Sequence, residues 1–228
     1  MKGNRQMYCQ HCGMSLTEFK FIFADQPVCQ QCYLSLQNTS STTFDRQELL
    51  SRDRVHIDDP LAISNLKKII NRQLELKYHS STQKLIVTCV GTDRSTGDAL
   101  GPLVGSKLTN FRLNNKVDIF GTLEAPVHAT NLEEKIEVIQ RTYNNPFIIA
   151  IDAGLGKNKS VGSISVKHGP LRPGSGVNKD LPEIGNLHIT GLVNVSGYME
   201  YFVLQSTRLN IVFKMAKIIS YALAKSLR

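Results

Sequence analysis

The sequence predicts an α/β domain with a mainly parallel sheet and helices on both of its faces, preceded by a small zinc ribbon. Short apolar runs of strand length alternate with stretches whose apolar residues recur at helical spacing, which is typical of a parallel sheet covered on both sides. Four of the five cysteines form two C-x2-C pairs near the start of the chain. The three predicted parts are a ribbon at residues 1–36, a linker at 37–57 and an α/β domain at 58–228.

The composition is that of a globular protein without long charged or apolar runs. The 228 residues are 41% hydrophobic and 20% charged, with a formal net charge of +8 that is spread along the chain. No block of like charges marks a nucleic-acid-binding surface, so we expect no direct nucleic-acid binding. No apolar stretch has the length of a membrane span, and the first residues do not resemble a signal peptide. We therefore expect a cytoplasmic protein with no membrane attachment and with reduced cysteines.

The clustered cysteines are Cys9 with Cys12 and Cys29 with Cys32. Four thiolates at this spacing fill the tetrahedral shell of one zinc ion and leave no open position for chemistry. The strand and turn expected between the pairs, at 19–27, are too small to fold without such a metal. A redox C-x-x-C motif or unpaired thiols are the alternatives. We expect a structural zinc in a ribbon that stabilises the chain or docks a partner.

A polar stretch of small residues at 37–45 starts the linker. A helix is expected to begin at Asp58-Asp59-Pro60, because apolar residues follow there at helical spacing. These apolar positions are Leu61, Leu66, Ile69, Ile70 and Leu74.

The central motif is an apolar strand at 85–90 that leads through a polar turn into a helix at 98–111. We expect Asp98 in the first turn of that helix, where the helix dipole favours a carboxylate, and Pro102 close to the helix start. Asp93 and Asp98 then lie at the carboxyl edge of the sheet, where open α/β folds bind ligands. The alternative is that Asp93 only forms a turn and Asp98 only caps the helix.

The rest of the chain continues the alternation of strands and helices. A capping box at Thr130–Glu133 is expected to start a helix, and Cys89 is interpreted as a core residue of the first strand. The predicted strands are 117–122, 147–151, 161–167 and 187–195, and the predicted helices are 130–143, 198–205 and 209–227.

Asp152 directly follows the predicted strand 147–151. Because parallel strands bring their carboxyl ends to one edge, we expect the carboxylates of Asp98 and Asp152 within about 7 Å of one another. Three histidines follow or begin strands and could join them: His128, His168 and His188. Two carboxylates and one imidazole suit a divalent metal ion with open positions. The glycine-rich loop 169–177 is interpreted as a substrate-binding loop beside them.

Four segments carry a resemblance to a known family: 91–105, 145–153, 173–177 and 197–205. They resemble the YyaC-type spore proteases of endospore-forming bacteria, over the chain from about residue 58 to its end. That family is similar to the spore germination protease, which degrades small acid-soluble DNA-binding spore proteins, and to the hydrogenase maturation endopeptidases. The resemblance implies a phosphorylase/hydrolase-like α/β fold. The zinc ribbon departs from the family pattern.

The resemblance implies an endopeptidase that acts on a protein or peptide substrate in sporulation or germination, in the cytoplasm of the forespore or spore core. Asp98 and Asp152 match the acidic pair of both relatives, and His188 matches a metal-contacting histidine of the maturation endopeptidases. Two mechanisms remain open: the aspartates share a proton and activate water, or they hold a second divalent metal with His188. The alternative function is a non-catalytic sporulation factor that recruits a partner through its ribbon.

Overall fold

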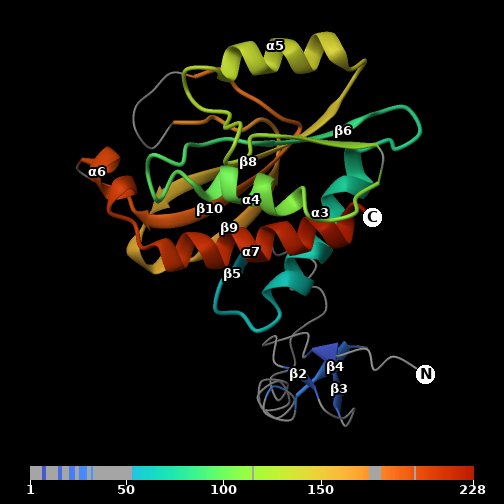
Figure 1. Cartoon of the computed structure of the whole chain (residues 1–228), viewed down its shortest axis with the longest axis vertical. Helices are drawn as coiled ribbons and strands as arrows, with labels where there is room; N and C mark the ends of the chain where they lie inside the picture. Colours follow the sequence, from blue (N-terminus) through green and yellow to red (C-terminus); the bar gives the residue numbers. More distant parts are fainter. Residues whose placement is uncertain are drawn as a thin grey trace. The chain divides into compact units, whose positions relative to one another are not determined.

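The computed structural model describes residues 7–8, 15–16, 21–23, 26–29, 32, 53–114, 116–174, 181–197 and 199–228. The chain forms two compact units, Met1–Arg52 and Asp53–Arg228 (Figure 1). In the first unit two short antiparallel pairs are described. Strand β1 (Met7–Tyr8) pairs with β2 (Ser15–Leu16), and β3 (Phe21–Phe23) pairs with β4 (Gln26–Val28).

The four predicted zinc ligands lie partly outside the described residues. Cys9 and Cys12 are not described. Cys29 directly follows β4 and is half-buried, and Cys32 is buried. The predicted linker lies outside the described residues up to residue 52.

The second unit contains a six-stranded sheet in the order β5-β9-β10-β8-β6-β7. The four strands from β10 to β7 run parallel, whereas β9 is antiparallel to β10 and β5 is antiparallel to β9. The strands are β5 (Arg54–His56), β6 (Leu85–Cys89), β7 (Val117–Phe120), β8 (Phe147–Gly156), β9 (Ser163–His168) and β10 (Leu187–Val195).

The α/β fold is confirmed, but the sheet is mixed because β9 reverses direction. Only residues 157–162, which include a short 3-10 helix at Asn158–Ser160, connect β8 to β9. A crossover between parallel strands needs a dozen or more residues, so this connection is too short to return β9 in the parallel sense. Strand β5 takes up residues that the sequence analysis assigned to the end of the linker.

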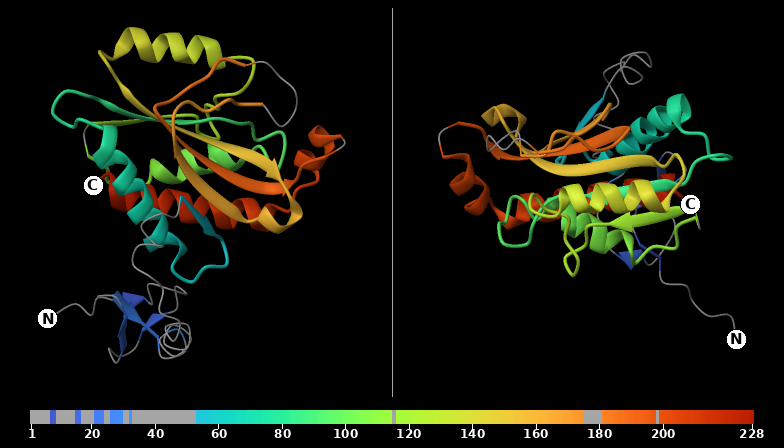
Figure 2. Two further views of the ribbon diagram at one scale, coloured as in Figure 1. Left: turned by 180° about the vertical axis from the view of Figure 1, so that it is seen from behind. Right: turned by 90° about the horizontal axis from the view of Figure 1, so that it is seen from above.

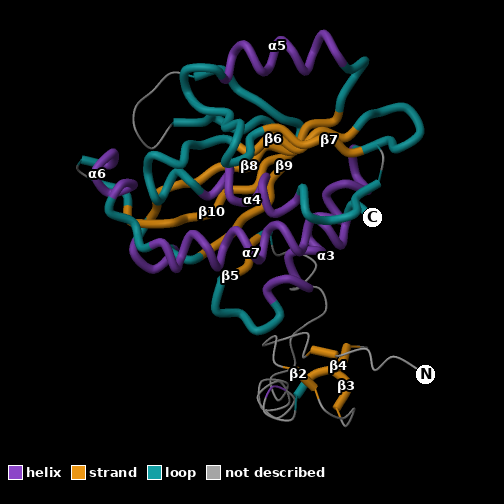
Figure 3. Tube along the Cα trace, viewed as in Figure 1, coloured by secondary structure: helices purple, strands orange, loops and turns teal. Residues whose placement is uncertain are grey.

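Helices cover both faces of the sheet, as predicted (Figures 1 and 2). On one face lie α3 (Ala62–Lys77), α4 (Leu100–Leu108) and α7 (Leu209–Ser226), whose buried apolar residues pack in one core with Val87 of β6. On the other face α5 (Leu132–Thr142) buries Leu132 in a smaller core with Ala150 of β8. A short helix, α6 (Glu200–Gln205), connects β10 to α7 (Figure 3).

One local prediction, the capping box at Thr130–Glu133, is corrected by the structure before α5. The N-cap of α5 is Asn131 rather than Thr130, and no side-chain cap forms. The Asn131 amide instead accepts a hydrogen bond from the His128 N–H (2.8 Å) and donates one to the Pro126 carbonyl (3.0 Å). These bonds fix the loop before the helix, so the predicted capping box does not form.

Among the described helices, none has the length and apolar character needed to cross a membrane.

Candidate active site

Strand β8 is longer than predicted and carries Asp152 inside it rather than after it. The ladder between β6 and β8 ends where Cys89 pairs with Ile151. Strand β8 nevertheless continues to Gly156, because β10 continues beside it to Val195. Asp152 is therefore the first residue of β8 beyond the end of β6. This places its side chain at the carboxyl edge of the parallel ladder, which is where open α/β sheets bind ligands.

Asp98 lies before the helix α4, and not in its first turn as predicted. The N-cap of α4 is Ala99, and the first turn of the helix contains no acidic residue. Asp98 ends the turn that follows β6, where its carbonyl accepts a hydrogen bond from the Thr92 N–H (3.2 Å). Asp98 therefore lies one residue before the N-cap of α4, in a loop that is fixed by backbone hydrogen bonds.

Gly97 fixes that loop against α6. Its N–H donates to the carbonyl of Leu204 (2.8 Å). A Cβ atom at Gly97 would lie 2.8 Å from Cδ2 and 2.9 Å from the carbonyl oxygen of Leu204, so the close approach requires glycine. Gly97, the residue before Asp98, is thus hydrogen-bonded directly to α6, the helix that follows β10.

The structure brings Asp98, Asp152 and His188 together on one cavity of about 370 Å³. The first comes from the turn after β6, the second from β8 and the third from β10. Thr190 also lines the cavity, and it pairs in register with Asp152 across the ladder between β8 and β10. Leu204 of α6 lines the same cavity. Elements far apart in sequence therefore meet at this edge of the sheet.

Asp152 and Asp98 are electrostatically coupled. Asp152 is only 7% exposed, whereas Asp98 is half-buried. Burial raises the pKa of the Asp152 carboxyl well above its usual range, the negative charge of Asp98 raises it further, and the Ala153 backbone N–H lowers it. That N–H donates to Oδ1 of Asp152 at 2.8 Å. The site therefore favours a protonated carboxyl beside a carboxylate, which is the arrangement that one shared proton requires.

His188 is half-buried and its ring is held by the loop after β9. Its Nδ1 lies 3.0 Å from the carbonyl oxygen of Gly169. A neutral ring that donates from Nδ1 to this carbonyl keeps Nε2 as a hydrogen-bond acceptor. The contact thus fixes the ring at the edge of the cavity and leaves its second nitrogen for another partner.

The other candidates from the sequence lie elsewhere. His128 does not line the cavity, and its Nδ1 contacts Oγ1 of Thr130 at 2.9 Å. His168 is the exposed last residue of β9, and Asp93 is an exposed turn residue. Cys89 is fully buried in the core, as predicted, and burial raises the pKa of its thiol. Of the three histidines, only His188 lines the cavity with the two aspartates.

Sequence reasoning missed Thr190 and Arg172, both of which line the cavity. Thr190 could have been found by strand alternation, because residues two apart on a strand share a face and His188 was already a candidate. Arg172 lies in the predicted loop 169–177 and pairs with Glu183. Residues 175–177 of that loop lie outside the described residues.

The aspartates and His188 do not form a ready ligand set. Within the ranges that the structure describes, no three His, Cys, Asp or Glu side chains are arranged so that they could hold a metal ion. This applies to the cavity, whose side chains are described, and not to the cysteine pairs, of which one is outside the described residues.

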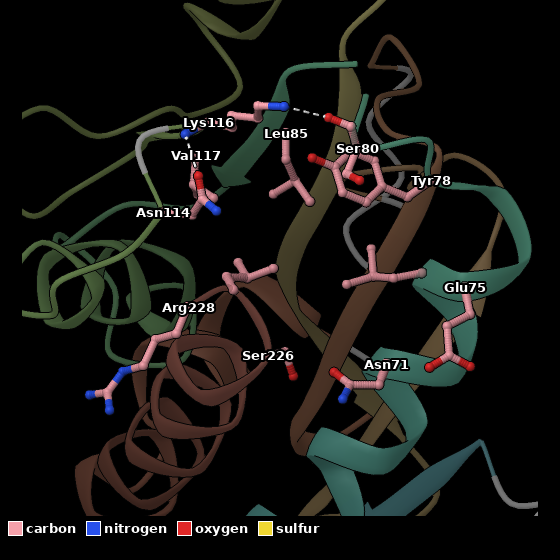
Figure 4. A pocket seen from close by; sticks show the side chains of 12 residues that line it. Asn71, Glu75, Tyr78, Ser80, Leu85, Asn114, Lys116, Val117, Ser226 and Arg228 are labelled. Carbon is pink, nitrogen blue, oxygen red and sulfur yellow. Dashed lines mark hydrogen bonds between the residues drawn. The ribbon is translucent and has the colours of Figure 1, made fainter. Parts of the chain in front are cut away.

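A larger cavity of about 440 Å³ lies at the opposite edge of the sheet (Figure 4). It is lined by Leu85 and Val117, the first residues of β6 and β7, and by Arg228 at the end of the chain. Lys116 donates from Nζ to the carbonyl of Ser80 (2.8 Å) on its rim. This cavity contains none of the candidate catalytic residues. It also lies at the amino ends of the parallel strands, whereas ligands of open α/β sheets bind at the carboxyl ends.

The fold and the acidic cavity define an α/β protein with a coupled carboxyl pair at the carboxyl edge of its sheet. The chain belongs to the family described as "Protein of unknown function (DUF1256)", whose model matches residues 54–222. It is 48% identical over 187 residues to "Uncharacterized protein YyaC" from Bacillus subtilis (strain 168), a match that covers 82% of this chain and 89% of that protein. The resemblance to YyaC stated from the sequence is thereby confirmed.

Two solved structures match part of the chain at low identity and with TM-scores below 0.5. One is a [NiFe] hydrogenase maturation protease, HycI, from Thermococcus kodakarensis KOD1, with 13% identity, a TM-score of 0.45 and coverage of 70% of this chain and 98% of that chain. The other is the hydrogenase maturating endopeptidase HybD from E. coli, with 15% identity, a TM-score of 0.38 and coverage of 63% and 94%.

Proposed function

We propose that this protein is an endopeptidase that hydrolyses a peptide bond with Asp98 and Asp152 as an acid/base pair. The observation that carries the proposal is the buried Asp152 carboxyl, whose pKa is raised by burial and by Asp98, on a cavity that Asp98 shares. Pairs of titratable groups whose environments push their pKa values apart are typical of acid/base catalysis. The carboxyl pair thus provides both a proton donor and a proton acceptor.

In the proposed reaction the Asp98 carboxylate accepts a proton from a water molecule as the water oxygen bonds to the carbonyl carbon of the peptide. The protonated Asp152 donates its proton to the carbonyl oxygen, which gives a neutral tetrahedral diol. The carbon–nitrogen bond then breaks. The leaving nitrogen takes the proton from Asp98, and a diol hydroxyl returns its proton to Asp152, so that the pair regains its starting state.

Thr190 and His188 are proposed to orient the reactants rather than to exchange protons. Thr190 lies opposite Asp152 in the ladder and brings a hydroxyl to the same cavity. His188 is held through Nδ1 and keeps Nε2 for a hydrogen bond to the substrate. Fixed donors and acceptors at a water-excluded site stabilise charge as it develops.

The family resemblance further supports a role in sporulation or germination, with small spore proteins as substrates and the forespore or spore cytoplasm as the compartment. The test is to incubate the purified chain with small proteins extracted from spores and to identify the new peptide termini by mass spectrometry. Defined cleavage sites are expected, and intact proteins throughout the panel would contradict this substrate assignment.

We also propose a structural zinc in the first unit, held by Cys9, Cys12, Cys29 and Cys32. The support is the spacing of the two cysteine pairs. A closed shell of four thiolates stabilises a small unit but performs no chemistry. The ribbon would accordingly be a stability or docking element and not part of the cavity.

The experiment that tests the peptidase is a cleavage assay on three isosteric variants. Asp152→Asn and Asp98→Asn should each lower the rate by about 10²–10⁴-fold, because each removes one partner of the proton transfer. Asp93→Asn is the matched control, since Asp93 lies in the same turn as Asp98 but is exposed and does not line the cavity. Full activity of Asp152→Asn would contradict the mechanism.

A further inference from the structure

The last five residues of β8 have a free edge beside the candidate catalytic pair. Strand β8 pairs with β10 on one side from Ile149 to Gly156, but β6 lies on its other side only as far as Ile151. In the part of the second unit that the structure describes, no other strand pairs with β8 beyond that point. The free edge therefore begins at Asp152.

The direction of the backbone groups on this edge follows from two hydrogen bonds. The Ile151 carbonyl accepts from the Val90 N–H at 2.7 Å, so Ile151 faces the β6 side. The Gly156 carbonyl accepts from the Ser196 N–H at 2.8 Å, so Gly156 faces the β10 side. Because the peptide groups of successive strand residues point alternately to the two sides, Ala153 and Leu155 face the side that β6 has left.

These backbone groups lie on the cavity itself. Ala153, Gly154 and Leu155 line it together with Asp98 and Asp152. The Ala153 N–H bonds to the Asp152 carboxyl, but among the described residues no backbone group outside the sheet bonds to Leu155. An exposed strand edge is a ready template for pairing with another chain.

The face of β8 that carries Asp152 has no other side chain in this stretch. Strand alternation puts Gly154 and Gly156 on that face. A Cβ atom at Gly154 would lie 2.9 Å from Cγ2 of Thr190, and one at Gly156 would lie 2.9 Å from Cδ1 of Leu192. Glycine at these positions makes room for the side chains of Thr190 and Leu192 on the neighbouring strand. On this face of the sheet, a bound chain thus meets no β8 side chain beyond the Asp152 carboxyl.

Apolar side chains make up part of the surroundings of the edge. Leu171, Leu192 and Leu204 line the cavity. The helix that carries Leu204 also exposes Met199, at its N-cap, and Tyr201 and Phe202 to solvent, which are 52%, 59% and 56% exposed. An extended segment with apolar side chains would bury the apolar part of this lining.

We infer that the ligand of this site is an extended polypeptide segment with apolar side chains, which adds a strand to the free edge of β8 at Ala153–Leu155. The choice of a polypeptide rests on the peptidase function proposed above. Main-chain pairing holds an extended peptide independently of most of its sequence, and neighbouring pockets select its side chains. The pairing also runs the peptide past Asp98 and Asp152, so that a peptide bond lies at the carboxyl pair.

The test measures binding separately from cleavage. Full-length protein with Asp152→Asn is titrated with a panel of unstructured peptides about 12 residues long, rich or poor in apolar residues, and binding is followed by fluorescence anisotropy. The apolar peptides are expected to bind more tightly. Absence of binding by every peptide in the panel overturns the inference.

A matched pair of variants in the same background tests the edge. Leu155→Pro removes the N–H that faces the free edge, and Leu155→Ala removes the same side chain but keeps the N–H. Binding to Leu155→Pro should be at least about tenfold weaker than binding to Leu155→Ala, as expected for a lost hydrogen bond and a blocked approach. Equal binding by the two variants overturns the inference.

A second measurement leaves the protein surface unchanged. Peptides methylated at every second backbone nitrogen should lose binding in one of the two alternating sets and keep it in the other, because only one set faces β8. Equal effects of both sets contradict strand pairing. If the wild-type chain cleaves no peptide but this alternation is seen, strand addition stands and the peptidase function fails. If peptides are cleaved without the alternation, the peptidase function stands and strand addition fails.

Discussion

From Phe147 to Ile151, β8 pairs with β6, and from Ile149 onward also with β10, whereas from Asp152 to Gly156 it lies beside β10 alone. In the first half Ile149, Ala150 and Ile151 are completely buried, and they stabilise the sheet through the cores on its two faces. In the second half the residues after Asp152 are half-buried and include two glycines. Residues that stabilise the sheet and residues beside the proposed catalytic site thus lie in different halves of one strand. Substitutions in the first half should mainly change the free energy of unfolding, and substitutions in the second half should mainly change binding and cleavage.

The largest expected effect on stability is in the first half. Ile149→Ala should lower the free energy of unfolding by about 2–5 kcal/mol, because it leaves a cavity in a fully buried core. Leu155→Ala, in the half-buried second half, should lower it clearly less. Urea unfolding of both variants measures the difference. Equal losses would contradict the division of β8 into two halves.

The next effect concerns the contact that holds the Asp98 turn. Gly97→Ala should cost about 1–3 kcal/mol of unfolding free energy and should also slow cleavage, since the added methyl group meets the backbone and side chain of Leu204. Gly197→Ala is the control, because a Cβ atom there has no neighbour within 4 Å. Thermal unfolding and peptide cleavage are measured for both. Identical behaviour of the two variants would remove the role assigned to Gly97.

The raised pKa of Asp152 makes stability depend on pH. Because its pKa is higher in the folded chain than in the unfolded chain, its contribution is complete below the unfolded pKa and is lost as pH rises through the folded pKa. The loss is up to about 1.4 kcal/mol for each pH unit between the two values. Unfolding from about pH 4 to about pH 8 should show this decline in the wild type and a flatter curve in Asp152→Asn. Parallel curves for the two proteins would show that Asp152 is not responsible.

The smallest effect on the site is expected from the first unit. The full chain should contain about one zinc ion, and Cys9→Ser with Cys29→Ser should remove it.

Removal of residues 1–36, with or without a chelator, should leave the rate of peptide cleavage by the α/β unit within about twofold of that of the full chain, since the site is built from the second unit. Cleavage lost only on chelation in the shortened chain would support a metal held by Asp98, Asp152 and His188. No cleavage by the full chain, together with biological function lost on removal of residues 1–36, would favour the non-catalytic factor that recruits a partner through its ribbon.

The sequence predicted those parts of the fold that depend on local periodicity. The strand at 187–195 and the helix after Asp58-Asp59-Pro60 were predicted closely, because each has a clear apolar pattern with a break at its end. The pairing of Asp98 with Asp152 on one cavity also followed from the rule that parallel strands share an edge. Their catalytic role stays a prediction.

The features that the sequence did not predict depend on pairing between strands. Asp152 lies within β8 because β10 continues beside it, and β9 reverses because its connection is short. Neither fact is visible in the apolar pattern of one strand. Asp98 precedes its helix because backbone bonds of the turn hold residues 92–98, which helix spacing alone does not reveal.

The most direct test of the account is the titration of the Asp152 carboxyl, followed by NMR of the protein labelled with ¹³C at the aspartate side-chain carboxyl carbons and assigned with Asp152→Asn. The account predicts that Asp152 titrates well above the usual carboxyl range and that its pKa falls in Asp98→Asn, because the neighbouring negative charge is gone while burial remains. An Asp152 that titrates in the usual carboxyl range, or that is unaffected by Asp98→Asn, would contradict the coupled acid/base pair on which the proposed peptidase depends.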